Sequence, residues 1–214
     1  MNRTVVRPII AFTLALSTAA CASKKQAGAA IGAGVGAAVG GVVGNQTGST
    51  ARGAIIGAVV GGTAGAVIGH QMDQQAKELE QVIPGAVVER VGEGIQVTFD
   101  SGLLYDFDSD QIRSAAAANL RSLAANLGKY PDTDVLIVGH TDSMGADEYN
   151  RRLSQQRAEA AQRFLTSEGV ASNRLRTSGR GEIEPIATNE SEAGRQANRR
   201  IELAIVASAS PRRP

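Results

Sequence analysis

Short apolar runs separated by Gly, Pro and polar residues set the pattern between residues 86 and 206. The first two runs lie on either side of Gly92-Glu93-Gly94, and this arrangement predicts a β-hairpin. A Ser-Gly break precedes the third run, and Pro131-Asp132 precedes the fourth. In chain order the runs predict strands at residues 87–91, 95–99, 103–107, 135–138, 175–178 and 201–206.

Two longer stretches carry apolar residues at the spacing of an α-helix. The first covers residues 114–127, places its leucines on one face and ends at Gly128. The second begins with Ser154 as the predicted N-cap and ends at Gly169, and its buried stripe comprises Ala158, Ala161 and Leu165. A polar loop is predicted at 181–198. Strands that alternate with helices predict helices packed on one sheet, in a domain over residues 86–206 that is followed by a disordered tail, 207–214.

Residues 28–69 have a different pattern, with glycine at every fourth position in two sets. This spacing places the glycines of a set along one side of a helix, where another backbone can approach closely. Arg52 is the only charged residue between Gln26 and Asp73, and it lies in a polar break between the sets. We therefore predict a hairpin of two helices, which resembles the glycine-zipper domain. The glycines fall at 28, 32, 36, 40 and 44, and at 53, 57, 61, 65 and 69.

The hairpin suits lipid better than water, because each glycine costs a helix in water about 1 kcal/mol relative to alanine. In lipid an unpaired backbone group costs more, so the helix is enforced. Each 17-residue segment would be about 25 Å long, slightly short of the ~30 Å hydrocarbon core. Membrane embedding, a seam in a soluble oligomer and a flexible linker all remain open for this segment. The polar residues 70–85, which end at Pro84-Gly85, are interpreted as a linker, and a helical extension over 71–85 is the alternative.

The first 20 residues read as an export signal, with a basic start, a short apolar run and small residues before Cys21. The sequence Thr18-Ala19-Ala20-Cys21 resembles a bacterial lipobox, although Thr18 stands where leucine is usual. That resemblance implies acylation of Cys21, and acyl chains would anchor the protein in a lipid bilayer. Residues 21–27 would then form a lipidated spacer. The absence of Asp after Cys21 resembles an outer-membrane address.

Composition excludes several classes of function. The formal charge is +1, and loss of Arg3 and Arg7 with the signal would leave −1, which gives no basis for binding nucleic acid. One cysteine allows no internal disulfide, and two histidines give no metal cluster at ligand spacing. We find no GxSxG motif and no nucleophile paired with a base. We therefore expect no enzyme, no metal and no cofactor.

Asp142 and Arg157 are the candidate binding pair. Asp142 follows the predicted strand at 135–138, and Arg157 lies in the first turn of the predicted helix that starts at Ser154. A carboxylate and a guanidinium in one pocket suit a zwitterionic ligand, since one holds an ammonium and the other a carboxylate. The residues alone equally allow a structural salt bridge.

Four motifs resemble the OmpA C-terminal family, which includes peptidoglycan-associated lipoproteins and flagellar stator proteins. The resemblance implies an α+β fold, a βαβαβ sandwich with helices on one face of a mixed sheet. The motifs are Tyr105-Asp106-Phe107-Asp108, Gly139-His140-Thr141-Asp142, Asn150 with Leu153-Ser154 and Arg157-Ala158, and Asn198-Arg199-Arg200-Ile201.

The same resemblance implies non-covalent binding of peptidoglycan through the diaminopimelate of its stem peptides. Asp142 would pair with the ammonium and Arg157 with the distal carboxylate, where a helix N-terminus would also favour an anion. Either Arg199 or Arg200 would close the carboxylate side, and the two residues alternate if they continue a strand. The other implied site residues are Asp106, Phe107, Thr141, Asn150 and Leu153.

We therefore expect a non-enzymatic lipoprotein that tethers the outer membrane to peptidoglycan, with its C-terminal domain in the periplasm. The alternative is a membrane-embedded glycine-zipper oligomer, or a membrane-stress or assembly factor, in which wall binding only localises the protein. A stator-like ion channel is disfavoured because both zipper segments lack an ionisable residue. Homo-oligomers through the zipper are possible in either case.

Overall fold

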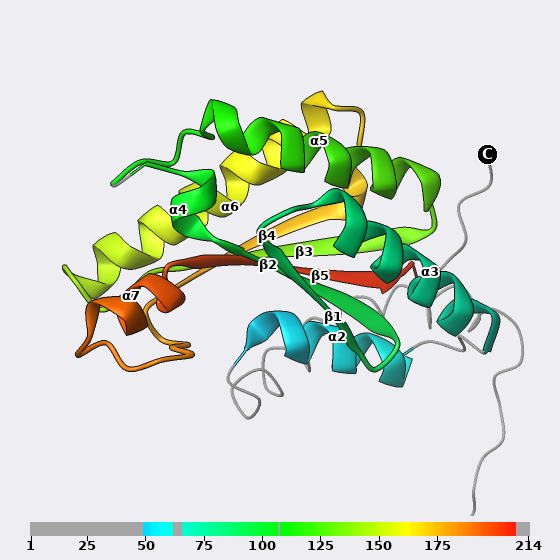
Figure 1. Cartoon of the computed structure of the whole chain (residues 1–214). Helices are drawn as coiled ribbons and strands as arrows, with labels where there is room; N and C mark the ends of the chain where they lie inside the picture. Colours follow the sequence, from blue (N-terminus) through cyan, green and yellow to red (C-terminus); the bar gives the residue numbers. More distant parts are fainter. Residues whose placement is uncertain (1–48, 62–65, 107, 209–214) are drawn as a thin grey trace, which may run out of the picture.

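A computed structural model describes residues 49–61, 66–106 and 108–208. Five strands form one sheet in the order β1-β2-β5-β3-β4 (Figure 1). β3 and β4 are parallel and the other neighbours are antiparallel, so the sheet is mixed, as predicted. The strands are β1 (Ala86–Val91), β2 (Gly94–Asp100), β3 (Thr133–His140), β4 (Leu175–Gly181) and β5 (Arg200–Ala207).

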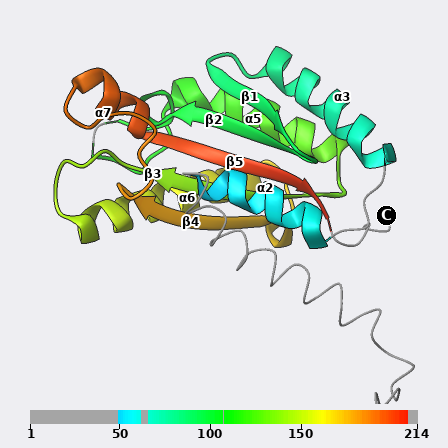
Figure 2. The same cartoon turned by 90° about the horizontal axis from the view of Figure 1, so that it is seen from below.

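Helices α5 (Ser114–Lys129) and α6 (Asp147–Ser167) cover one face of this sheet, and α3 (Ala66–Val82) packs beside α5 (Figure 1). Helix α2 (Thr50–Gly61) lies against the opposite face, where it contacts β5 and its neighbours (Figure 2). The prediction of helices packed on a mixed sheet is confirmed. It placed the helices on one face only, whereas α2 also covers part of the opposite face. Three short helices complete the fold: α4 (Ser101–Leu104), η1 (Ser172–Arg174) and α7 (Glu192–Asn198).

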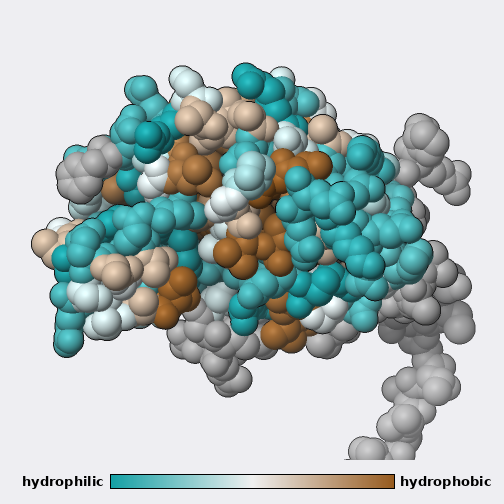
Figure 3. Space-filling model, viewed as in Figure 1, coloured by the Kyte–Doolittle hydropathy of each residue, from teal (hydrophilic) through white to brown (hydrophobic). Residues whose placement is uncertain are grey.

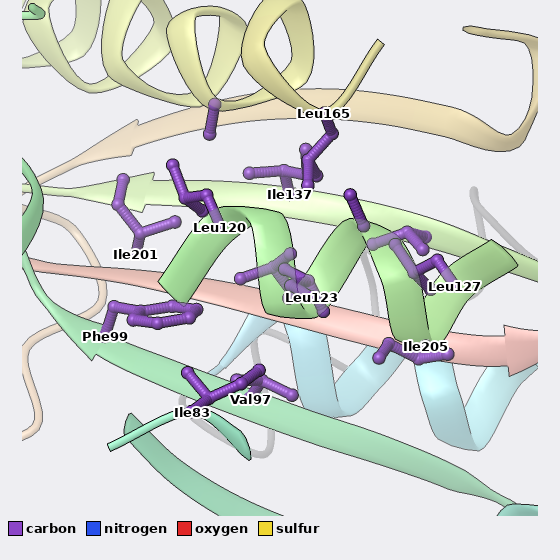
Figure 4. Packing of buried hydrophobic residues seen from close by; sticks show 14 of the residues in the cluster. Ile83, Val97, Phe99, Leu120, Leu123, Leu127, Ile137, Leu165, Ile201 and Ile205 are labelled. Carbon is purple, nitrogen blue, oxygen red and sulfur yellow. The ribbon is translucent and has the colours of Figure 1, made fainter. Parts of the chain in front are cut away.

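The main core lies between the sheet and the layer of α3, α5 and α6. Figure 4 shows Leu120, Leu123 and Leu127 of α5 pointing toward Phe99, Ile137 and other strand residues. These five named side chains are at most 1% exposed. Full burial of one such side chain stabilises the fold by about 1.5–3 kcal/mol, so this layer supplies much of the driving force.

Helix α6 begins at Asp147, seven residues before the predicted N-cap. Ser154 lies inside the helix, fully buried, with its Oγ donating to Arg151 O and accepting from Gly181 N. A Cβ at Gly139 would collide with the backbone of Ser154, so this glycine lets α6 lie close to β3. The missed signal was the acidic pair Asp147 and Glu148, which favours a helix N-terminus.

Two other predicted segments have a different structure. The strand expected at 103–107 is replaced by helix α4, because the Asp100 carboxylate accepts from Gly102 N and starts a helical turn. After it, Tyr105 forms only an isolated bridge with Ile112. The loop expected at 181–198 contains α7, whose start is capped by Ser191 Oγ. Both short helices begin at a local side-chain cap rather than an apolar pattern.

Residues 70–85, interpreted as a linker, largely belong to α3. Their buried side chains recur every three or four residues and join the main core: Met72, Ala76, Leu79 and Ile83. In the described parts of the chain, no helix is both long and apolar enough to cross a bilayer. The predicted signal, Cys21, the first zipper segment and most of the tail lie outside the described residues.

Candidate functional site

The candidate site lies where the end of β3 meets the start of β5. These strands are antiparallel and pair Gly139 with Ile201, so the residues after β3 lie beside those before β5. Helix α6 crosses the same end of the sheet, and α7 precedes β5 (Figure 1). The fold thus brings together side chains from motifs that are about 60 residues apart in sequence, such as Asp142 and Arg199, 57 residues apart.

Asp142 is paired with Arg199, not with Arg157. Asp142 Oδ2 lies 2.5 Å from Arg199 Nη1, and its Oδ1 accepts from Met144 N at 3.0 Å. Arg199 Nη2 also donates to Glu192 at 2.7 Å and to Gln196 at 2.8 Å. Partial burial works against the charge of Arg199, but the hydrogen bonds to Glu192 and Asp142 raise its pKa above the ordinary value. Asp142 as a residue is 7% exposed, so it is largely buried beside Arg199.

Arg157 is a buried cation with few protein partners. Only 5% of the residue is exposed, and burial lowers the pKa of its guanidinium. Its Nε donates to Ser109 O at 2.9 Å, and the guanidinium stacks 5.4 Å from the centre of the Tyr105 ring. Among the described residues it forms no ion pair within 4.0 Å. Its charge is therefore desolvated without a carboxylate in contact.

The position of Arg157 corrects one prediction. It lies ten residues beyond Asp147, the first residue of α6, and not in the first turn. The backbone donors of that N-terminus therefore do not assist an anion at Arg157, since their effect is confined to the first turn. Burial is the largest influence on the pKa of Arg157 and lowers it, Tyr105, Asp108 and Tyr149 act in the opposite direction, and the charge of Arg199 adds a smaller lowering effect.

Asn150 and Thr141 hold the loop after β3 in place. Asn150 Nδ2 donates to Asp142 O at 3.3 Å and to Glu182 Oε2 at 2.6 Å, and the residue is 2% exposed. Thr141 N donates to Gly181 O at 2.9 Å, while its buried Oγ1 has no hydrogen-bond partner among the described residues. Sequence reasoning missed Glu182, which carries no motif of its own.

The loop after α4 forms the other side of the site. Asp106 is exposed, with its carboxylate 3.5 Å from Arg113, and Leu153 is half-buried. Tyr149 OH donates to Asp108, and this hydrogen bond raises the pKa of Tyr149. Asp108 has a positive φ of 55°, which is uncommon outside glycine. Phe107 lies outside the described residues.

Arg200 lies on the opposite face of the sheet, which settles the alternation left open by the sequence. It is 1% exposed, and its Nε donates to Glu202 at 2.7 Å. His140, also fully buried on this face, has its Nε2 3.8 Å from Glu202. Where the structure is described, no three His, Cys, Asp or Glu residues are placed to hold a metal ion.

Exposed apolar side chains accompany the loops near the site. The described residues include Met144, Ile183 and Ile186, which are 65%, 54% and 56% exposed. In the face seen in Figure 3, hydrophobic patches are separated by hydrophilic residues and do not merge into one large surface. Scattered exposure of this kind is normal in a folded domain and assigns no partner by itself.

Two family models match the chain: "OmpA family" over residues 104–199 and "YMGG-like Gly-zipper" over residues 1–73. The peptidoglycan-associated lipoprotein of Brucella melitensis biotype 1 is 36% identical over 116 residues, which cover 54% of this chain and 69% of the relative. The chain belongs to the OmpA family. The resemblance to the OmpA family that the sequence suggested is therefore confirmed.

Two other relatives also match part of this chain. Outer membrane porin F of Pseudomonas fluorescens is 40% identical over 119 residues, 56% of this chain and 36% of the porin. The probable lipoprotein YiaD of Escherichia coli (strain K12) is 36% identical over 138 residues, 64% of this chain and 63% of the relative. The chain thus spans about a third of the porin and under two thirds of YiaD.

Solved structures agree with the fold. The periplasmic domain of Helicobacter pylori MotB has a TM-score of 0.55 at 26% identity, over 61% of this chain and 85% of that one. The cell wall anchor of the T6SS from Pseudomonas aeruginosa has a TM-score of 0.55 at 28% identity, over 64% and 96%. Both similarities support the OmpA-like arrangement of sheet and helices.

Proposed function

We propose that the folded domain binds peptidoglycan and that the chain anchors the outer membrane to the cell wall without catalysing a reaction. The relatives' names support this reading, since one is a peptidoglycan-associated lipoprotein and one solved structure is a cell wall anchor. The site itself supports binding over chemistry. It offers charged and polar side chains for recognition, while no nucleophile paired with a base is found among its described residues.

The ligand we propose is the diaminopimelate side chain of the stem peptide. The observation that carries this proposal is Arg157, whose buried guanidinium has no carboxylate in contact among the described residues. A desolvated cation is unfavourable until an anion joins it, and a guanidinium holds a carboxylate through two parallel hydrogen bonds. The distal carboxylate of diaminopimelate supplies that anion.

Asp142 would take the ammonium on the same carbon of diaminopimelate. In the structure Arg199 Nη1 donates to Oδ2 of this carboxylate. The ligand ammonium would replace Nη1, and Arg199 would stay held by Glu192 and Gln196. Such an exchange keeps every charge paired, so the net cost of opening the pair is small.

The remaining site residues would shape the pocket around this pair. Asn150 would keep Asp142 in position through its backbone carbonyl, with Glu182 holding the amide. We propose that four further residues line the pocket or contact the ligand: Asp106, Phe107, Thr141 and Leu153. Arg200 is not part of the proposed site, because its side chain pairs with Glu202 on the other face.

The anchor at the other end would be an acylated Cys21, with the folded domain in the periplasm. Relatives named as an outer membrane porin and as lipoproteins support the location. Mass spectrometry of the mature N-terminus tests the anchor: we expect a diacylglyceryl-modified Cys21, and an unmodified residue other than Cys21 would refute it. Zipper-mediated oligomers stay a prediction.

Sedimentation of the full chain with purified peptidoglycan tests the function. Asp142→Ala and Arg157→Ala each remove one member of a desolvated charge pair, a loss of about 2–5 kcal/mol, so both should leave the protein in the supernatant. Arg163→Ala is the matched control, because Arg163 lies on the same helix and its side chain is 63% exposed. Undiminished sedimentation of both site variants, with thermal unfolding unchanged, would remove the site.

A further inference from the structure

The face of the sheet opposite the main core carries buried charges that the proposed binding site does not use. The glutamates Glu184 and Glu202 are 6% and 2% exposed. Each has an arginine partner: Arg180 lies 2.8 Å from Glu184, and Arg200 lies 2.7 Å from Glu202. Buried carboxylates are expensive unless further hydrogen bonds satisfy their remaining lone pairs.

The start of α2 supplies those hydrogen bonds. Ser49 Oγ donates to Glu202 Oε2 at 2.5 Å, and Thr50 Oγ1 donates to Glu184 Oε1 at 2.5 Å. The backbone N of Thr50 donates to Glu184 Oε2 at 2.9 Å. Ser49 Oγ also accepts from Arg52 N, so one serine both caps the helix and binds a sheet residue. Helix N-termini favour negative charge, and here two carboxylates lie at one.

Next to this polar contact, apolar side chains of α2 pack against the same face of the sheet. Ala51 and Ile55 are fully buried and form a second, smaller core with Val138 and Ala204. Gly94 makes room for the helix, since a Cβ there would lie 2.6 Å from Ile55 Cγ2. At the rim, Arg52 pairs with Glu89 at 2.5 Å. Figure 2 shows α2 lying along β5 on the side away from α5 and α6.

This helix belongs to the second half of the glycine-zipper pattern, where no charged residue occurs between Arg52 and Asp73. Its apolar side chains can be buried by the sheet or by lipid, but not by both at once. Ile55, for example, has no exposed surface left for another partner. Docking on the sheet and insertion into a lipid surface therefore exclude each other.

We propose that this face of the sheet is a docking site for residues 49–57 of the same chain, recognised through Glu184 and Glu202, and that docking withholds the segment from lipid. The proposal concerns a site separate from the Asp142–Arg157 region and does not depend on peptidoglycan binding. It assigns a role to the polar break before α2, because Ser49 and Thr50 of this break donate the hydrogen bonds by which Glu202 and Glu184 recognise the segment.

Thiol labelling of the full chain tests the docking. Ala204→Cys places a small thiol under α2, at a position that is 1% exposed, and peptide mass spectrometry separates its reaction from that of Cys21. Labelling should be slow in this background. Adding Ser49→Ala and Thr50→Ala removes hydrogen bonds to two charged groups and should raise the rate about ten- to a hundredfold. Thr166→Ala with Ser167→Ala, an adjacent Thr-Ser pair at the end of α6, is the matched control and should not change it.

Two outcomes of this labelling would overturn the proposal. Fast labelling already in the Ala204→Cys background would show that the segment does not dock. Slow labelling that Ser49→Ala and Thr50→Ala leave unchanged would show that the glutamates do not recognise it. A circular dichroism melt of each variant distinguishes release of α2 from general unfolding, because general unfolding would lower the melting temperature of the whole domain.

The lipid half of the proposal has its own measurement. The chain contains no tryptophan, so Ile56→Trp, on the exposed side of α2, gives a single reporter. Mixed phosphatidylethanolamine and phosphatidylglycerol vesicles with brominated acyl chains should quench it weakly in this background. Quenching should become strong once Ser49→Ala and Thr50→Ala are added. Equal quenching in both chains would overturn the claim that docking withholds the segment from lipid.

Discussion

Arg199 and Arg200 are neighbours in sequence with opposite surroundings. Arg199 faces Asp142, and its side chain remains 24% exposed, with Glu192 and Gln196 as further partners. Arg200 faces the α2 side, is 1% exposed and bonds Glu202 and the carbonyl of Glu184. The strand alternation between them separates a partly exposed ion pair from one that is enclosed in the fold. Identical side chains thus form a partly exposed ion pair on one face and a buried ion pair on the other.

The largest expected effect is on stability, at Arg200. Arg200→Ala removes the guanidinium that pairs with Glu202 and leaves this glutamate buried beside His140. Loss of one partner of a buried ion pair costs about 3–5 kcal/mol of folding stability. Arg199→Ala, the matched change one residue away, should cost under about 1 kcal/mol because its pair is partly solvated. Urea unfolding measures both. Equal losses would erase the distinction between the two faces.

A smaller effect concerns pH and His140. Burial, followed by the charges of Arg200 and Arg180, lowers the pKa of His140 well below its ordinary value of 6.5. The unfolded chain therefore takes up a proton below about pH 6.5 while the folded chain does not. Stability should fall by about 1.4 kcal/mol per pH unit from there down to the folded pKa.

The control for this pH effect is His140→Leu, because the described structure gives the ring nitrogens no hydrogen-bond partner to lose. Unfolding free energies measured between about pH 6.5 and 5 should flatten in this variant. A slope that persists unchanged without His140 would assign the pH dependence to other groups.

The smallest effect is expected at Glu192, on the binding side. Its hydrogen bonds to Arg199 and then Arg195 lower the pKa of this exposed carboxyl. The stabilisation is present above the unfolded pKa, near 4.5, and is lost as the pH falls through the lower folded value. Glu192→Gln should change peptidoglycan affinity by no more than about threefold, since the amide still accepts from Arg199. A tenfold loss in sedimentation would make Glu192 a contact residue.

The spacing of apolar residues, together with the residues that favour turns, predicted most of the folded domain. The hairpin over Gly92-Glu93-Gly94, helix α5 and the last strand agree with the structure, since each has a clear apolar period and a stop signal. Errors fell where side-chain caps set the local structure, as at Asp100 and Ser191. The predicted start of α6 was also wrong, because Ser154 Oγ accepts a hydrogen bond from Gly181 N within the fold instead of capping a helix.

The sequence predicted which residues would lie at the candidate site better than it predicted which of them form ion pairs with one another. Asp142, Arg157 and Arg199 were identified from motifs, but the Asp142–Arg199 pair depends on the register of β3 with β5, which no local pattern encodes. Glu182 and Glu184 lie two residues apart in a polar loop and contact different regions, Asn150 and Thr50. Such long-range roles become visible only once the chain is folded.

The central claim is that Asp142 and Arg157 hold the two charged groups of one diaminopimelate side chain. Calorimetric titration tests it most directly, with a stem tripeptide that contains meso-diaminopimelate and the same peptide with lysine, which lacks the distal carboxylate. The wild-type chain should lose about 2–5 kcal/mol of binding free energy on this replacement. Arg157→Ala should bind both peptides equally weakly, because the lost interaction is the same one. Equal affinity of the wild-type chain for the two peptides would contradict the account.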